Sequence, residues 1–354
     1  MARIVVGISG GVDSSVAALL LKRAGHEVIG VFMNNWEEVD GAGVCTAERD
    51  WADARDVCDA IGIPYYGVSF AKEYRERVFS HFLSEYRKGR TPNPDVLCNR
   101  EIKFSSFLDF AKKAGAEKLA TGHFAGVDCV NGRYRLLRAK DENKDQTYFL
   151  YMLGQRALSY ACFPLRNLLK AEVRKIAQEA SLPTFSKKDS TGVCFIGERD
   201  FKPFLMQYLP AQPGQIQTED GTVVGTHDGL MYYTLGQRRG LGIGGGNGGR
   251  WFVVEKNLER NVLVVSQGDE SRLYVGHATA SALTWTSGSA PAMDGEPFPC
   301  QIRIRHRQPL QDAVIAIRGD RMHMEFAAKQ RAVTGGQAAV VYRGEECLGG
   351  GTID

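Results

Sequence analysis

Residues Ser9–Ser15 read S-G-G-V-D-S-S and lie between a strand-like run, Arg3–Ile8, and a helix-like run, Val16–Lys22. A glycine pair between a strand and a helix lets backbone N–H groups turn toward an anion, and the helix start adds partial positive charge. The segment predicts a phosphate-binding loop. It lacks the G-K-[ST] ending of a Walker A loop, so it offers no lysine to the β- and γ-phosphates, which favours loss of pyrophosphate as a unit. The alternative is an ordinary strand-to-helix turn, with Asp13 or Ser14 capping the helix.

Two cysteine-containing segments have residue types that suit nucleophilic chemistry. In Gly89–Asn99, two prolines break helical periodicity and stiffen a loop that carries Asn93, Asp95 and Cys98. A stiff loop can hold a thiol and a reacting base in fixed relation. Cys194 lies among small residues just before a predicted helix, where a cysteine can have a lowered pKa. Taken alone, each cysteine is more often a small buried hydrophobic residue.

The elements that must position these residues alternate between strand-like and helix-like segments over about the first 200 residues. Such alternation predicts a doubly wound parallel sheet that binds ligands at the carboxyl ends of its strands. Gly11, Met33 and Gly122 each fall at such an end. A helical hairpin is predicted over 155–179.

Short β-like runs replace the helices in the rest of the chain. The clearest are residues 262–265, 301–305 and 338–342. Regular short strands separated by turn residues predict small β domains or barrels. A chain of 354 residues exceeds the usual size of one core. We therefore expect a catalytic domain over 1–205, a small β-rich domain over 206–275 and a C-terminal barrel-like domain over 276–354.

The composition, with 44% hydrophobic and 24% charged residues, is typical of a soluble globular protein. No apolar run approaches the roughly 20 residues that cross a bilayer, and the N-terminal apolar stretch is too short for a signal peptide. A cytoplasmic protein without a membrane partner is expected. The eight cysteines form no C-x-x-C pair, which argues against a zinc or iron–sulfur site, so no metal bound by the protein alone is expected. The net charge of +3 implies that RNA would be bound by local patches.

Six motifs occur in order along the chain. They are S-G-G-V-D-S-S, T-P-N-P-D-V-L-C-N, K-D-Q-T-Y-F-L, S-T-G-V-C-F-I-G, Y-T-L-G-Q-R-R-G-L-G-I and C-L-G-G-G-T-I. The first resembles the loop of the N-type ATP pyrophosphatase superfamily, whose members form AMP and pyrophosphate while adenylating a substrate oxygen. The whole series resembles the tRNA-specific 2-thiouridylase family over essentially the full chain.

This resemblance implies a tRNA-uridine 2-sulfurtransferase that uses ATP with Mg²⁺. Such an enzyme adenylates the C2 oxygen of the wobble uridine (position 34), so that AMP can leave and sulfur from a cysteine persulfide can replace it, giving 2-thiouridine. Cys194 would carry the persulfide, Cys98 would attack it to leave a Cys98–Cys194 disulfide, and Asp95 would act as general acid/base. The implied partners are the tRNAs that accept Lys, Glu or Gln, together with a persulfide relay protein or a cysteine desulfurase. A monomer is expected.

The resemblance also assigns binding residues. Those implied for ATP are Gly7, Ile8, Ser9, Gly10, Gly11, Val12, Asp13, Ser14, Ser15, Met33 and Gly122. Those implied for tRNA are Asn93, Pro94, Asp95, His123, Lys144, Asp145, Gln146, Arg305, His306 and Gln337. The family usually has tyrosine where this chain has His306.

Two other functions are compatible with the motifs taken one by one. An adenylating ligase for a small metabolite would need the phosphate loop but neither cysteine, and it would have no use for the β-rich domains. An RNA-binding or sulfur-carrier protein would bind nucleotide only as a regulator. Release of AMP without tRNA would indicate the ligase, whereas tRNA binding without turnover would indicate the binding protein.

Overall fold

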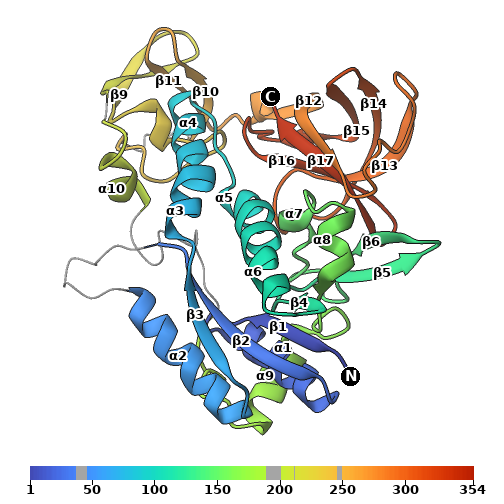
Figure 1. Cartoon of the computed structure of the whole chain (residues 1–354). Helices are drawn as coiled ribbons and strands as arrows, with labels where there is room; N and C mark the ends of the chain where they lie inside the picture. Colours follow the sequence, from blue (N-terminus) through green and yellow to red (C-terminus); the bar gives the residue numbers. More distant parts are fainter. Residues whose placement is uncertain (37–45, 189–200, 211, 245–248) are drawn as a thin grey trace.

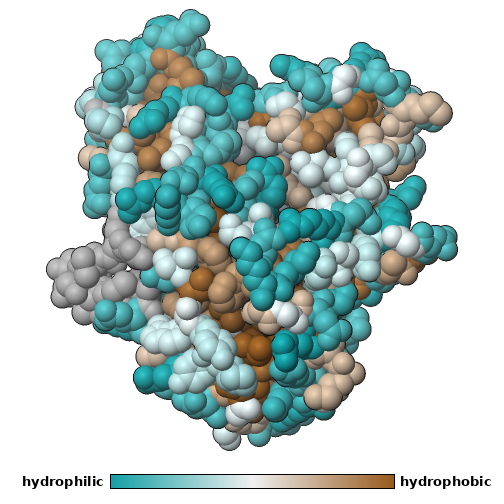
Figure 2. Space-filling model, viewed as in Figure 1, coloured by the Kyte–Doolittle hydropathy of each residue, from teal (hydrophilic) through white to brown (hydrophobic). Residues whose placement is uncertain are grey.

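The structure is a computed structural model that describes residues 1–36, 46–188, 201–210, 212–244 and 249–354. A parallel sheet with its helices lies at the bottom of Figure 1, a small β-rich part at the upper left and a barrel at the upper right, with α5 near the centre. Hydrophilic side chains cover most of the face in Figure 2, where the two upper lobes are separated by a notch. None of the described helices is both long and apolar enough to span a bilayer.

The parallel sheet positions the N-terminal motifs. Its strand order is β3-β2-β1-β4-β7, and every neighbouring pair is parallel. The strands are β1 (Arg3–Gly7), β2 (Glu27–Asn34), β3 (Tyr65–Ser69), β4 (Lys118–Ala120) and β7 (Ala161–Cys162). The chain runs outward from β1 to β3 and then returns to the other side of β1 with β4. The carboxyl ends of β1 and β4 therefore form the switch point where such sheets bind ligands.

Helices cover both faces of this sheet. Ile4 and Val6 of β1 share a buried cluster with α1 and α2, whereas Val5 between them belongs to the cluster that contains Phe107 and Leu108 of α6. The alternation follows from the two-residue period of a strand, and it confirms the predicted doubly wound sheet.

The helices fall into three kinds. The α-helices are α1 (Val12–Arg23), α2 (Thr46–Ile61), α3 (Ala71–Tyr74), α4 (Ser80–Arg87), α5 (Pro94–Leu97), α6 (Phe107–Lys113), α7 (Thr147–Leu150), α8 (Gln155–Tyr160), α9 (Lys170–Glu179) and α10 (Phe201–Met206). The π-helices are η1 (Arg75–Phe79) and η2 (Cys98–Ser106), and the 3-10 helices are η3 (Leu230–Tyr232) and η4 (Ser271–Leu273). The predicted helical hairpin over 155–179 is wrong in one respect, because the sheet strand β7 separates α8 from α9.

The middle part is a four-stranded sheet in the order β10-β11-β8-β9, in which β8 and β11 are parallel. Its strands are β8 (Gly214–Thr218), β9 (Val223–His227), β10 (Trp251–Asn257) and β11 (Val262–Gln267). Strand β11 confirms the strand predicted at 262–265. The boundaries at 205 and 275 stay predictions.

The C-terminal part is a closed barrel. Antiparallel pairing runs in the order β12-β15-β14-β13-β16-β17, and β17 pairs again with β12 to close the ring. The strands are β12 (Tyr274–Trp285), β13 (Phe298–Arg303), β14 (Gln311–Arg318), β15 (Arg321–Arg331), β16 (Ala338–Arg343) and β17 (Glu346–Ile353). The predicted strand at 338–342 matches β16, and β13 begins earlier and ends earlier than the predicted 301–305.

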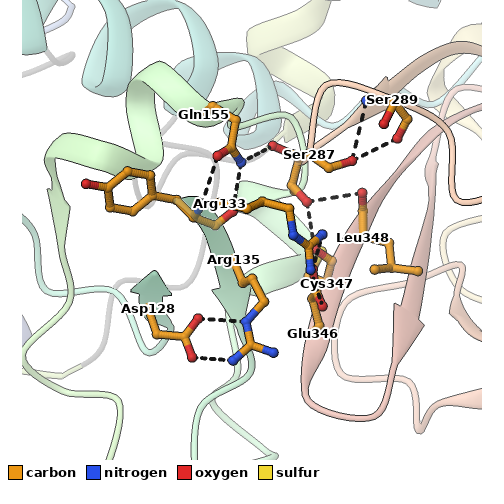
Figure 3. A network of polar contacts seen from close by, with 11 residues as sticks. Asp128, Arg133, Arg135, Gln155, Ser287, Ser289, Glu346, Cys347 and Leu348 are labelled. Carbon is orange, nitrogen blue, oxygen red and sulfur yellow. Dashed lines mark hydrogen bonds and ion pairs between the residues drawn. The ribbon is translucent and has the colours of Figure 1, made fainter. Parts of the chain in front are cut away.

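A hairpin from the N-terminal part extends the barrel sheet. Strand β6 (Arg133–Leu137) pairs with β5 (Gly126–Val130) on one side and with the start of β17 on the other. Figure 3 shows the polar contacts at this joint: Arg133 forms an ion pair with Glu346 at 2.9 Å, and Gln155 Nε2 donates to the carbonyl oxygens of Tyr134 and Thr286. The shared sheet holds the barrel against the parallel-sheet domain.

Candidate active site

The S-G-G-V-D-S-S segment forms the turn from β1 into α1, at the switch point of the sheet. Gly10 has φ of +69°, a conformation that favours glycine, and Gly11 is the N-cap of α1 without a side-chain cap. Ser14 Oγ accepts from Ser9 N at 3.2 Å and donates to the Gly11 carbonyl oxygen at 3.1 Å. A tight turn that leads into an uncapped helix of twelve residues suits a bound anion.

Met33 and Gly122 lie beside this turn. A Cβ atom on Gly122 would lie 2.6 Å from Ser14 N and 2.7 Å from the carbonyl carbon of Asp13, so the chain after β4 approaches the start of α1 closely because residue 122 is glycine. A Cβ atom on Gly7 would lie 3.4 Å from Cε of Met33. The structure therefore brings together the residues predicted to bind ATP.

The fold also brings cations to the turn, which the motif itself lacks. Lys170, the first residue of α9, contacts Asp13 Oδ1 through its Nζ at 2.5 Å. Lys187 contacts Asp50 and Asp53 of α2, and a Cβ on Gly10 would lie 2.9 Å from Cβ of Asp53. Sequence reasoning missed both lysines, since Lys170 is 157 positions away from Asp13 and no spacing pattern links them.

Asn93, Asp95 and Cys98 lie on one short helical segment. Asn93 Oδ1 accepts from Asp95 N at 3.1 Å and caps α5, whose first residue is Pro94. Asp95 is partly exposed, whereas Cys98 is buried and begins the π-helix η2. A spacing of three residues places Asp95 and Cys98 on the same side of a helix, and π-helical segments are frequent at functional sites.

Cys194 and the whole S-T-G-V-C-F-I-G motif lie outside the described residues. The pairing of Cys98 with Cys194 therefore stays a prediction. The described chain ends before this segment at Lys188 and resumes at α10. On the near side, Lys187 contacts α2. After the segment, the centroid of the Phe204 ring in α10 lies 6.1 Å from that of Phe79 in η1.

Three of the predicted tRNA contacts are buried, namely Pro94 and the two titratable residues His123 and Asp145. His123 is 9% exposed and lies 2.7 Å from Thr121 Oγ1, and its pKa is held well below the ordinary value by burial and by the charge of Lys103. Asp145 is 2% exposed and forms an ion pair with Arg303 at 2.7 Å. Neither side chain is open to direct contact with RNA in this arrangement, so their predicted roles would be indirect.

The segment Lys144–Gln146 connects the nucleotide side of the site to the barrel. Gln146 forms two hydrogen bonds with the backbone of Phe124. Its backbone N–H donates to the Phe124 carbonyl at 2.9 Å, and its Oε1 accepts from Phe124 N at 2.9 Å. Phe124 follows Gly122 and His123 in the chain, while the adjacent Asp145 reaches Arg303 of the barrel. Lys144 is partly exposed.

The predicted tRNA contacts of the barrel lie where it meets α7 and the loop before α5. The His306 ring packs 4.3 Å from that of Phe149, and its pKa is lowered to about 4 by burial and by the charges of Arg307 and Arg303. Arg305 donates to the Ala332 carbonyl at 2.7 Å. Gln337 Nε2 donates to the Thr91 carbonyl at 2.7 Å, two residues before Asn93. Gln337 is thus brought to the loop that carries the predicted base contacts.

The described residues hold no cluster of three or more histidine, cysteine, aspartate or glutamate side chains that could bind a metal ion. A groove of about 520 Å³ lies at the opposite ends of the strands, lined among others by Ala2, Ile4 and Lys118 at the starts of β1 and β4. Its lining also includes Phe163, whose ring centroid lies 6.2 Å from that of His123.

Comparison with known proteins gives matches to three family models. The tRNA methyl transferase HUP domain matches residues 2–198, the tRNA methyl transferase PRC-barrel domain matches 202–267, and the aminomethyltransferase beta-barrel domain matches 275–353. Among solved structures, a 4-thiouridine synthetase in complex with RNA and ATP is similar at 19% identity, over 59% of this chain and 50% of that one, with a TM-score of 0.37. That likeness is too low to support an inference about this chain.

Curated relatives match over nearly the whole length. The tRNA-specific 2-thiouridylase of Bacillus velezensis is 58% identical over 99% of this chain and 95% of its own, and that of Bacillus subtilis is 57% identical over the same shares. The family descriptions mention methyl transfer, but these relatives span all three matched segments and are named for thiolation. The chain belongs to the tRNA-specific 2-thiouridylase family.

Proposed function

We propose that this protein is a tRNA-uridine 2-sulfurtransferase that replaces the C2 oxygen of the wobble uridine by sulfur and consumes ATP to do so. The observation that carries the proposal is the 57–58% identity to 2-thiouridylases over 99% of the chain. The phosphate-type turn at the switch point and the segment with Asp95 and Cys98 are compatible with this chemistry.

The turn at the switch point fits a nucleotide phosphate. Gly10 and Gly11 provide a turn without side chains, α1 begins there without a side-chain cap, and Gly122 leaves no Cβ against Ser14. When bound, ATP supplies a group that turns the C2 oxygen into part of a good leaving group, AMP. Asp13 is the one carboxylate within Ser9–Ser15 and would hold the accompanying Mg²⁺, while Lys170 would offer positive charge to the phosphates.

The α5 segment would handle the base. Asn93 and Pro94 would contact the uracil, and Asp95 would move the proton that accompanies attack at C2. Its partial exposure and its place three residues before Cys98 suit that role.

The two cysteines would supply sulfur in two steps. The terminal sulfur of a Cys194 persulfide forms a bond to C2 as the bond from C2 to the adenylated oxygen breaks and AMP leaves. The Cys98 thiolate then attacks Sγ of Cys194, which forms a disulfide and leaves the other sulfur on C2 as the 2-thio group. The two cysteine thiols are oxidised and the transferred sulfur is reduced, so a reductant of the disulfide must act before the next turnover.

The partners follow from the same chemistry. The persulfide would come from a relay protein or a cysteine desulfurase, and the substrates would be tRNAs with Lys, Glu and Gln acceptors. We place the reaction in the cytoplasm and assign it to a monomer.

A reconstituted reaction tests the proposal. The protein is incubated with ATP, a persulfide donor and unmodified tRNA, and both AMP and 2-thiouridine are measured. We expect 2-thiouridine to form with AMP in equal amounts and only with tRNA present. AMP without tRNA would instead indicate a small-metabolite ligase, and tRNA binding without turnover would indicate a binding protein.

Replacement of single cysteines sharpens this test. Cys194→Ser should abolish thiolation and leave tRNA affinity unchanged. Cys129→Ser is the matched control, because Cys129 is exposed on the β5–β6 hairpin and should retain full thiolation. Normal thiolation by the Cys194→Ser variant would contradict the persulfide role.

A further inference from the structure

The backbone of Thr91 is held on both sides by one loop of the barrel. Thr91 N donates to the Gly335 carbonyl at 2.9 Å, and the Thr91 carbonyl accepts from Gln337 Nε2 at 2.7 Å. The barrel loop that follows β15 therefore forms two hydrogen bonds of ordinary length with a single residue of the parallel-sheet domain.

Gly336, between these two contacts, allows the close approach. Its φ is +90°, and a Cβ atom there would lie 3.0 Å from Thr91 N, 3.0 Å from Arg90 Cβ and 3.1 Å from the carbonyl carbon of Thr91. Both the backbone conformation and the lack of space require glycine at this position. The loop is thus shaped to fit against Thr91, independently of the Gln337 hydrogen bond.

The middle part, which contains the four-stranded sheet, also contacts Thr91. Thr91 Oγ1 lies 3.4 Å from Thr234 Oγ1, and a Cβ on Gly89 would lie 2.7 Å from Cδ2 of Leu258. All three parts of the molecule therefore meet at the start of the loop that leads into α5. Immediately before Thr91, Arg90 forms an ion pair with the buried carboxylate of Glu85.

The distance along the chain from this junction to the reacting groups is short. Pro92, which is buried, separates Thr91 from Asn93, and Asn93 caps the helix that carries Asp95 and leads to Cys98. Pro92 and Pro94 restrict the backbone on both sides of Asn93, so a displacement of Thr91 is transmitted to the cap rather than absorbed by rotation.

We propose that Gln337 is a positioning residue that holds the base-contacting segment Asn93–Cys98 in register by its hydrogen bond to Thr91. The inference rests on the function proposed above. This role differs from the direct contact with tRNA that the resemblance implies for Gln337, because Nε2 donates to the Thr91 carbonyl. Its Oε1 lies 3.5 Å from the hydroxyl of Tyr148, so both ends of the amide face protein groups.

The two roles differ in the quantity that they affect. A contact with tRNA contributes to tRNA affinity, whereas a positioning residue contributes to the rate of the chemical step once tRNA is bound. Loss of Gln337 should therefore lower the single-turnover rate of thiolation and leave the dissociation constant for tRNA almost unchanged.

The first experiment measures both quantities for Gln337→Ala and Gln337→Glu. The second variant keeps the size of the side chain and loses the N–H donor. We expect both to lower the single-turnover rate by about tenfold to a hundredfold, the range expected for a misplaced reacting group, with tRNA affinity within about twofold of the wild type. A tenfold weaker tRNA affinity with an unchanged rate would overturn the inference in favour of an RNA contact, and no change in either quantity would overturn it as well.

A second pair of variants tests the same contact without changing a side chain that could touch RNA. Gly336→Ala should reproduce the rate loss, because its Cβ would push against Thr91. Gly319→Ala is the matched control, since Gly319 also has a positive φ (+60°) in the same barrel but has no atom within 4 Å of its Cβ position. Equal rates for these two variants would contradict the inference.

Hydrogen exchange separates a local effect from misfolding. In Gln337→Ala, we expect faster amide exchange in residues 91–98 and unchanged exchange in the barrel strands. Unchanged exchange in residues 91–98 would overturn the proposal. Wild-type activity is measured first: a wild-type protein that does not thiolate tRNA would refute the proposed function, whereas an active wild type with an equally active Gln337→Ala would refute this inference alone.

Discussion

The phosphate-type turn and the loop before α5 differ in the sequence separation of the residues whose hydrogen bonds hold their backbones. The backbone of the turn is shaped by hydrogen bonds between residues three to five positions apart, as between Ser14 and Gly11 or Ser9. The side chains of Asp13 and Ser15 also contact Lys170 and Thr184, far along the chain. In the loop, Thr91 is held by Thr234 and Gln337, which are 143 and 246 positions away. The backbone of the turn is therefore formed by local contacts, whereas the loop before α5 is held by residues from the middle part and the barrel.

Because of this difference, substitutions in the two regions should have different effects. A change in the barrel can displace the segment with Asp95 and Cys98 and still leave the turn at the end of β1 intact. A change at the switch point should weaken nucleotide binding without moving Thr91. If the comparison is right, variants in the two regions will affect different steps of one reaction.

The largest effect on stability should come from the buried ion pair between Asp145 and Arg303, which joins the parallel-sheet domain to the barrel. Both side chains are almost fully buried, and Asp145 also accepts from Thr147. Arg303→Met should lower the free energy of unfolding by about 3–5 kcal/mol, because it leaves a buried charge uncompensated. Urea denaturation measures this loss, and the double variant Arg303→Met with Asp145→Leu should recover most of it. A double variant as unstable as the single one would show that the ion pair is not the cause.

The next largest effect should come from Gly122, on the nucleotide side. Gly122→Ala places a Cβ 2.6 Å from Ser14 N, so the start of α1 must shift. We expect the KM for ATP to rise by about tenfold or more, with tRNA affinity unchanged. Gly276→Ala is the control, since a Cβ on Gly276 meets no atom within 4 Å. A loss of tRNA affinity that equals the loss for ATP would break the separation between the two halves.

The smallest effect concerns pH and His306, on the barrel side. The folded protein holds the His306 pKa at about 4, below the ordinary value of about 6.5, so between these values the unfolded chain binds more protons. The free energy of unfolding should therefore fall as the pH falls from about 6.5 to about 4. In His306→Tyr this fall should be smaller, whereas His323→Tyr, which changes an exposed histidine of β15, should behave like the wild type. Thermal unfolding at several pH values measures the difference, and equal slopes for all three proteins would contradict it.

The sequence predicted the local half of the site better than the remote half. The Ser9–Ser15 motif and the alternation of strands and helices predicted the switch point, because a strand, a glycine turn and a helix are contiguous. The short strand β7 was missed, since two residues carry no periodicity. The contacts of Lys170 with Asp13 and of Gln337 with Thr91 were also beyond prediction, because long-range contacts depend on the closure of the barrel and of the sheet rather than on any spacing along the chain.

In the proposed reaction, the nucleotide half activates the same oxygen that the base half replaces. It is tested most directly with tRNA that carries ¹⁸O at C2 of the wobble uridine. Adenylation of this oxygen followed by attack of sulfur at C2 predicts that one ¹⁸O atom appears in AMP for each 2-thiouridine formed. Release of AMP without ¹⁸O during thiolation would contradict the account, since ATP would then be cleaved without activating the base.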